Sequence, residues 1–216
     1  MKAYKETEIK QVPNGNVVGS PIVINNIMSG FSTSNYLILP NSFNVSQNKK
    51  WEIITKVTTG STIEENASIF ASINDGSDAL WLETGRSKHW GLALTSGSGW
   101  TIANHIVGSY TVQTNTDYWL KLSFNGNAYI LSYSLDGVDY VTDITINSST
   151  SIRTLPLVVG IVKGGDAWKC PWNGSIDLSQ SYITIDSDLW WSGITDKEFN
   201  TYKIPKINKT YYGIGD

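Results

Sequence analysis

Residues 117–146, DYWLKLSFNGNAYILSYSLDGVDYVTDITI, decide the fold class of this chain. Apolar residues occupy every second position of the first segment, which is the pattern of a half-buried β-strand. They are Leu120, Leu122 and Phe124. A second alternating segment follows, and Asn125-Gly126 between the two is a favoured hairpin turn. Asp136-Gly137 then leads into a third segment. The stretch therefore predicts a three-stranded antiparallel meander.

The same alternation recurs along most of the chain. It places Trp51, Ile53, Thr55 and Val57 on one face of WEIITKV. No segment carries a sustained i, i+3, i+4, i+7 apolar pattern, so parallel βαβ units are not supported. A dozen short strands joined by turns predict an all-β sandwich, and 216 residues fit a single domain. Further strands are expected at 35–39, 67–74, 79–84, 90–95, 105–113, 155–162 and 175–186.

Composition and charge exclude several classes of protein. A formal net charge of -3 and the absence of a Lys/Arg stripe argue against a nucleic-acid partner. No run of about 18 apolar residues appears, so we expect no membrane insertion. Cys170 is the only cysteine, which excludes an intrachain disulfide and favours a buried thiol over a nucleophile.

The two ends of the chain differ from its middle. Residues 1–21 and 194–216 carry more charge and less alternation than residues 22–193. We predict an N-terminal arm, a lectin-like β-sandwich and a C-terminal arm with these boundaries. The arms are interpreted as edge strands or assembly contacts, with flexible ends as the alternative. The aromatic content of the C-terminal arm leads us to expect that it packs on its own domain or on a neighbour.

Four stretches between Gly30 and Gly193 resemble the laminin-G-like, concanavalin A-like sandwich family. FSTSNYLILP (31–40) resembles its opening strand, and Trp51-Glu52-Ile53 resembles the strand that follows. SLDGVDY (134–140) is similar to the family's S-x-DG-x-x-Y hairpin. WNGSIDL (172–178) matches the F/W-N-G-x-I-D stretch before the last long strand. The resemblance spans about three quarters of the chain. It implies a two-sheet antiparallel jelly-roll sandwich and a habit of binding glycans or protein surfaces.

Catalysis and metal binding find little support in the sequence. Retaining glycoside hydrolases need two carboxylates about 5 Å apart, and Glu83 has no acidic residue at i+2 or i+4. We therefore expect no catalytic residues, no cofactor and no metal site. The resemblance leaves open one calcium ion at a loop rim, held by Asp75 and Asp78 or by Asp166. A plain hairpin turn is the favoured interpretation of the stretch that contains Asp75 and Asp78.

Exposed aromatic and donor side chains are the expected ligand site, because sugar rings stack on indoles while hydroxyls pair with polar groups. The segment from Trp81 to His105 concentrates such residues, and Trp100, after a Ser-Gly loop, is the strongest single candidate. Trp90 alternatively packs inward with Leu92 and Leu94. Trp51, Trp119 and Trp172 are assigned to the core, and Trp190 and Trp191 are split between core and surface. The predicted ligand-binding residues are Trp81, Arg86, His89, Trp90, Trp100, His105, Asp166 and Trp168.

These features together favour a non-catalytic glycan-binding or host-attachment domain of a phage or bacterial surface structure. DLWWSG (188–193) and the lack of a signal-like stretch in MKAYKETEIK resemble sandwich domains of phage tails, collars and head fibres. The expected location is therefore extracellular or on the virion surface. Expected partners are a glycan or host-surface ligand and neighbouring virion subunits. The alternative is a structural module that decorates a virion through protein contacts, and a sandwich glycoside hydrolase ranks third.

Overall fold

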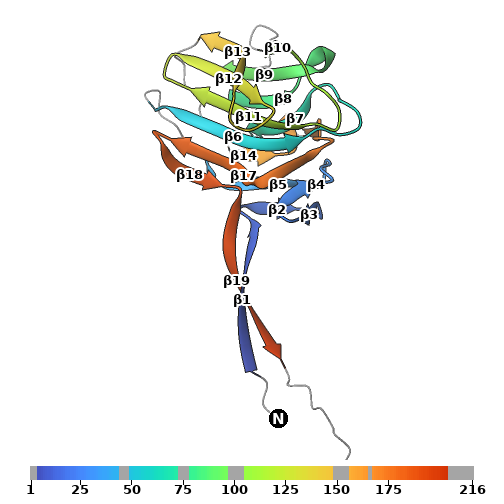
Figure 1. Cartoon of the computed structure of the whole chain (residues 1–216), viewed down its shortest axis with the longest axis vertical. Coiled ribbons are helices and arrows are strands. Elements are labelled where there is room, and N and C mark those ends of the chain that lie inside the picture. The colour runs from blue at the N-terminus through green and yellow to red at the C-terminus, as the bar shows by residue number, and fades with distance from the viewer. Residues whose placement is uncertain are drawn as a thin grey trace, which may run out of the picture.

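Two antiparallel sheets face each other across one core in the computed structural model, which describes residues 4–43, 49–72, 78–96, 105–147, 156–164 and 167–203 (Figure 1). This arrangement confirms the predicted all-β sandwich. Across the seven-stranded sheet the order is β10 (His105–Thr111), β9 (His89–Ser96), β8 (Asp78–Thr84), β7 (Ala67–Ser72), β14 (Pro156–Val159), β5 (Tyr36–Ser42) and β2 (Asn16–Val18). Across the eight-stranded sheet it is β13 (Val141–Asn147), β12 (Ala128–Ser134), β11 (Asp117–Phe124), β6 (Trp51–Thr58), β17 (Ser175–Ile185), β4 (Ile27–Ser29) and β3 (Ile22–Ile24), with β18 (Asp188–Ser192) paired to β17.

The predicted meander forms one side of the eight-stranded sheet. β11 pairs with β12 through Leu122 and Leu131, and β12 pairs with β13. Asn125 closes the first turn, where its side-chain oxygen accepts the backbone N–H groups of residues 127 and 128. Asp136 closes the second turn in the same way. Both turns lie where the Asn-Gly and Asp-Gly pairs predicted them.

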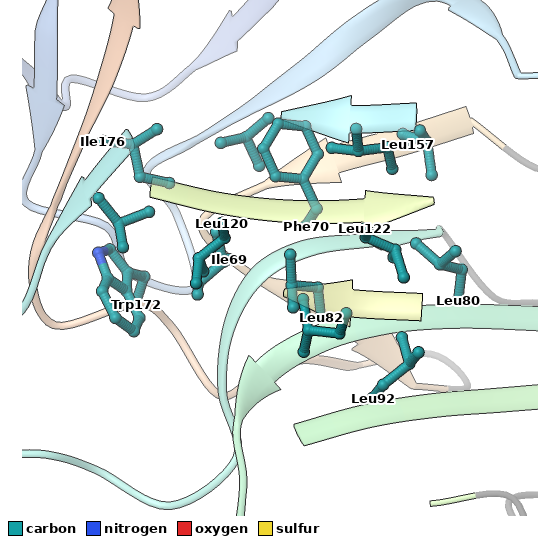
Figure 2. Packing of buried hydrophobic residues seen from close by; sticks show 14 of the residues in the cluster. Ile69, Phe70, Leu80, Leu82, Leu92, Leu120, Leu122, Leu157, Trp172 and Ile176 are labelled. Atoms are coloured by element: carbon teal, nitrogen blue, oxygen red, sulfur yellow. The ribbon is translucent and has the colours of Figure 1, made fainter. Parts of the chain in front are cut away.

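Alternation along the strands supplies the core from both sheets. In β6, burial alternates from one residue to the next and turns Trp51, Ile53 and Val57 inward. Figure 2 shows how Ile69, Phe70, Leu82, Leu120 and Leu122 meet between the sheets. In the eight-stranded sheet, the buried hydroxyls of Thr55 and Ser181 are paired by a hydrogen bond of 2.8 Å. Such pairing avoids the cost of an unsatisfied buried hydroxyl.

The tryptophans divide between core and surface. Trp51, Trp172 and Trp191 are buried and Trp190 is partly buried against the core, as predicted. The core assignment of Trp119 was wrong. Trp119 lies between Tyr118 and Leu120, both of which point inward, so alternation turns its ring onto the outer face of the eight-stranded sheet.

The chain ends pair with each other. β1 (Tyr4–Pro13) and β19 (Ile194–Lys203) form a ten-residue antiparallel ribbon, from Tyr4 opposite Lys203 to Pro13 opposite Ile194. The ribbon projects from the sandwich, with the start of β1 and the end of β19 at its far end (Figure 1). β2, within the predicted N-terminal arm, pairs with β5 in the seven-stranded sheet.

A hairpin covers part of the outer face of the seven-stranded sheet. It consists of β15 (Val162–Gly164) and β16 (Ala167–Lys169). Ile161 and Val162 pack there on Tyr36, Ala71 and Val158, which form a second, smaller hydrophobic cluster. This face is therefore not a bare sheet surface.

One side chain bridges the two sheets at their common edge. Asp143 of β13 reaches the irregular part of β10, where its Oδ1 accepts the backbone N–H groups of Ser109 at 2.8 Å and Tyr110 at 3.0 Å. Gly108 allows this approach, since a Cβ atom there would overlap the Asp143 carboxylate. The bridge fixes β10, the edge strand that carries His105.

Among the described residues, the only helical segment is the three-residue turn η1 (Arg86–Lys88). None of these residues therefore forms a helix able to cross a membrane.

Candidate functional site

The candidate site lies on the outer face of the seven-stranded sheet, at β8, β9 and β10. In β8, Leu80 and Leu82 point into the core, so Trp81 and Glu83 point outward. Trp81 stands opposite Ala93 of β9, and Ala93 stands opposite His105 of β10. Two larger side chains thus flank a small one across three neighbouring strands.

Small residues on β9 make room for the side chains of its neighbours. The Trp81 and His105 rings face each other over Ala93, with their centroids 6.2 Å apart and their planes 20° apart. Glu83 lies opposite Gly91. A Cβ atom on Gly91 would come within 3.0 Å of the Glu83 carboxylate, so a larger residue at that position would have to displace it.

A carboxylate and an imidazole are in direct contact at the centre of this face. His105 Nε2 lies 2.5 Å from Glu83 Oε1. The Glu83 side chain is fully buried, whereas the His105 side chain is 18% exposed. A buried carboxylate requires such partners, because burial of a lone charge is costly. We call Trp81, Glu83 and His105 the sheet-face cluster.

Cys170 borders the sheet-face cluster from the segment that follows β16. Its backbone carbonyl accepts the N–H of Ser68 at 2.9 Å, and Ser68 stands opposite Glu83. Burial, followed by the charge of Glu83, raises the pKa of the Cys170 thiol. The thiol is half-buried and stays protonated at neutral pH, which fits the predicted inert thiol better than a nucleophile.

A cleft of about 350 Å³ opens beside Cys170. It lies next to the loop that leads from β6 into β7, which contributes two carboxylates. Its lining residues are Phe31, Glu64, Glu65, Ala67, Cys170, Pro171, Trp172 and Asn173. Cys170 is thus shared between this cleft and the sheet-face cluster.

The structure brings two of the predicted ligand-binding residues together and places a third on the same sheet face. Trp81 and His105 are in the sheet-face cluster, and His89 lies on the same face of β9 as Gly91 and Ala93 by alternation. The prediction that Trp90 contacts a ligand was wrong. Trp90 is fully buried, and its ring packs edge-on against Tyr118 at 5.1 Å, so it cannot stack on a ligand.

The structure does not test the remaining predicted ligand-binding and calcium-binding residues. Trp100 and Asp166 lie outside the described ranges, and so do the side chains of Arg86 and Trp168. The same holds for Asp75 and for the side chain of Asp78. Within the described ranges, no group of three or more His, Cys, Asp or Glu side chains is arranged to hold a metal ion.

Sequence reasoning missed Glu83 as a ligand-site residue. Alternation does place Trp81 and Glu83 on one strand face, and that signal was available. The contact with His105 depends on cross-strand register, which alternation alone does not give. Gly91 and Ala93 are a weak second signal, because small residues within a strand mark a close approach of other groups.

Comparison with known proteins places the fold. No protein-family model and no curated protein matches the sequence. Among solved structures, domain 4 of AbnA, a GH43 extracellular arabinanase from Geobacillus stearothermophilus in complex with arabinotriose, matches with a TM-score of 0.55 and 16% identity over 86% of this chain. Mouse laminin α1 domains LG4-5 match with a TM-score of 0.53 and 13% identity over 82% of this chain. The enzymatically active domain of bacteriophage CBA120 tailspike protein 2 matches with a TM-score of 0.52 and 13% identity over 87% of this chain.

These similarities establish the fold and nothing finer. The chain has the jelly-roll sandwich of laminin G domains, as the sequence motifs predicted. It spans 82% of the arabinanase domain, but 46% of the laminin structure and 29% of the tailspike structure. At such identities, function has to be argued from the site.

Proposed function

We propose that this protein is a non-catalytic glycan-binding or host-attachment domain of a phage or bacterial surface structure. The observation that carries the proposal is the sheet-face cluster, in which two parallel rings stand beside a buried carboxylate. Ring faces pack on the C–H groups of a sugar, and the buried carboxylate orients the partly exposed imidazole of His105 for hydrogen bonding to the sugar hydroxyls. A site of this kind needs no cofactor and no metal.

The fold supports this proposal. One protein of similar fold is a carbohydrate-active enzyme domain in complex with arabinotriose, and another belongs to a phage tailspike. A glycan is therefore the ligand we expect, and the virion surface or the extracellular space is the location we propose. Neighbouring virion subunits are the proposed second class of partner.

The non-catalytic part rests on the carboxylates. Retaining hydrolysis uses two of them about 5–5.5 Å apart. Within the described ranges, Glu83 is the only acidic side chain in the buried set, and its observed contact is the imidazole of His105. A carboxylate buried and engaged in this way suits the orientation of an imidazole better than nucleophilic attack.

A glycan array and a cell-binding assay on the purified protein test the proposal. We expect specific retention on one glycan class and weaker retention for His105→Ala. Thr145→Ala, on an exposed edge strand of the other sheet, is the control. An array without any retained glycan, or hydrolysis of a retained oligosaccharide during overnight incubation, would contradict the proposal.

The alternative is an assembly module, and one surface favours it. The β3–β4 hairpin exposes Ile22, Ile24 and Ile27 at 56%, 63% and 43%, beside the projecting ribbon. Exposed apolar groups at a sheet edge are typical of contacts with other chains. Sedimentation of the protein and of Ile24→Lys separates the two functions. An oligomer that this variant dissociates, without loss of glycan retention, assigns the hairpin to assembly and the sheet-face cluster to binding.

A further inference from the structure

A second cleft lies on the opposite side of the sandwich from the sheet-face cluster. It is about 410 Å³ in volume and opens on the outer face of the eight-stranded sheet, over the ends of β6, β11 and β17. Its lining residues are Lys50, Trp51, Glu52, Ser123, Phe124, Asn125, Tyr182, Thr184 and Ser187. This volume falls within the roughly 300–1,000 Å³ that small-molecule sites occupy.

Strand register places polar groups side by side on the floor of this cleft. Glu52 stands opposite Ser123 on one side and opposite Thr184 on the other. One step along, Ile54 stands opposite Lys121 and Tyr182. A carboxylate, two hydroxyls and a tyrosine ring therefore face outward from three neighbouring strands.

The β17–β18 turn fixes one end of the cleft. The Asp186 carboxylate accepts the backbone N–H of Lys50 at 3.0 Å and pairs with Lys49 Nζ at 2.5 Å. The backbone N–H of Asp186 donates in return to the Lys50 carbonyl at 2.8 Å. These bonds hold the start of β6 against the turn, so the cleft is bounded by ordered backbone.

Tyr140 approaches the other end of the cleft from the Asp-Gly turn. Lys121 Nζ lies 4.6 Å from the centre of its ring. Burial raises the pKa of the Tyr140 phenol, and the charges of Tyr182 and Glu52 raise it further. The Asp-Gly turn therefore packs beside Lys121 at the margin of the cleft.

Trp119 on the same face is occupied with structural contacts. Its ring N–H donates to Gln180 at 2.8 Å, Lys56 Nζ lies 4.7 Å from its centre, and Gly137 approaches the ring so closely that a Cβ atom would be 3.0 Å from it. These contacts cover the indole. Lys121 lies over the Tyr140 ring in the same way, so Tyr182, which lines the cleft, is the aromatic side chain that we expect to contact a ligand.

We propose that this cleft is a second carbohydrate-binding site, which takes neutral oligosaccharides independently of the sheet-face cluster. The charges of Glu52 and Lys50 are of opposite sign within the same cleft, so neither a polyanion nor a polycation is favoured there. Hydroxyl, carboxylate and ammonium groups suit a polyhydroxylated ligand, and the Tyr182 ring suits its C–H faces. With sites on both faces, one domain would bridge two glycan chains.

Amide chemical shifts of 15N-labelled protein test this inference and the proposed function separately. The probes are cellohexaose, xylohexaose, mannohexaose and maltohexaose, with a hexamer of galacturonic acid as the charged comparison. We expect at least one neutral probe to shift the amides of Glu52, Ser123 and Thr184. Tyr182→Ala should weaken this binding about tenfold or more, as expected for the loss of a stacking ring. Thr145→Ala should leave it unchanged.

The outcomes distinguish the two sites. If no neutral probe shifts amides of the eight-stranded sheet, or if Tyr182→Ala binds as the wild type does, the second site is wrong. If the galacturonate hexamer binds there more tightly than every neutral probe, its neutral specificity is wrong. If the only shifted amides are those around Glu52, the second site holds and the sheet-face cluster is not the glycan site.

Discussion

Truncation of two tryptophans on neighbouring strands should affect ligand binding in different ways. Trp81 of β8 is partly buried and faces outward beside His105, whereas Trp90 of β9 is fully buried and faces Tyr118. Replacement of either by Ala removes an indole of the same size. The two variants therefore form a matched pair that separates a ligand contact from a core contact.

The expected stability losses follow from burial. Truncation of a fully buried Trp such as Trp90 costs about 3–5 kcal/mol. An aromatic side chain buries ~200 Å², and most of Trp81 is buried against the second hydrophobic cluster, so about two thirds or more of that area at ~25 cal/mol per Å² gives about 3–4 kcal/mol for Trp81. The stability losses of the two variants therefore overlap, and binding is the measurement that separates them. In a chain of this size each kcal/mol lowers Tm by roughly 2–4 °C. Urea unfolding followed by fluorescence measures both losses.

The expected effects on binding differ between the two variants. Trp81→Ala should weaken glycan binding about tenfold or more, because the stacking surface is gone. Trp90→Ala should retain the wild-type affinity in the fraction that remains folded. Titration calorimetry at a temperature below both transitions compares them. If Trp81→Ala loses as much stability as Trp90→Ala and keeps its affinity, Trp81 is a packing residue and the sheet-face cluster is not the ligand site.

Three further substitutions test the framework around the sites. Asp143→Ala should destabilise the fold by about 1–3 kcal/mol, since two backbone N–H groups of β10 lose a charged acceptor, and hydrogen exchange at those amides should accelerate. Replacement of the whole Glu83–His105 pair, by Met and Leu respectively, should leave stability equal or higher, as replacement of both partners of a buried pair by apolar groups often does, while glycan binding is lost. Hydrogen bonding and charge from Lys56 lower the pKa of Asp117, so its contribution is present above the unfolded pKa of ~3.9 and is lost as pH falls further. The stability difference between wild type and Asp117→Asn should therefore shrink below about pH 4 in urea titrations.

The meander was predictable because its signals are local. Asn125 and Asp136 each close a turn within three residues of themselves, and β11, which leads into the first turn, alternates without interruption. The residues that fix these turns are therefore neighbours in sequence. The ribbon of β1 and β19 has no such signal, because its partners lie at opposite ends of the chain. Its long-range pairing was outside what a period-two pattern reports.

The candidate site was predictable only in part for the same reason. Alternation gives Trp81 and Glu83 a common face, but His105 joins them only through the register of β8 with β9 and of β9 with β10. Trp90 illustrates the opposite error. Its own strand alternates large and small side chains, and the large set, which ends at Leu94, points inward. The size pattern on β9 carried more information than the presence of an aromatic residue.

The burial of Glu83 is the strongest reason to expect a ligand on this face. It stands opposite Ser68 of β7 and Gly91 of β9. Trp81 and Cys170 beside it pack against the second hydrophobic cluster, so an apolar side chain at the position of Glu83 would extend that cluster. Removal of a carboxylate from water costs several kcal/mol even after relaxation, and an ion pair offsets this only in part. His105 meets one carboxylate oxygen while keeping part of its own surface in solvent. A buried carboxylate beside a partly open imidazole serves stability poorly, whereas it orients that imidazole for hydrogen bonds with a hydroxyl-rich ligand.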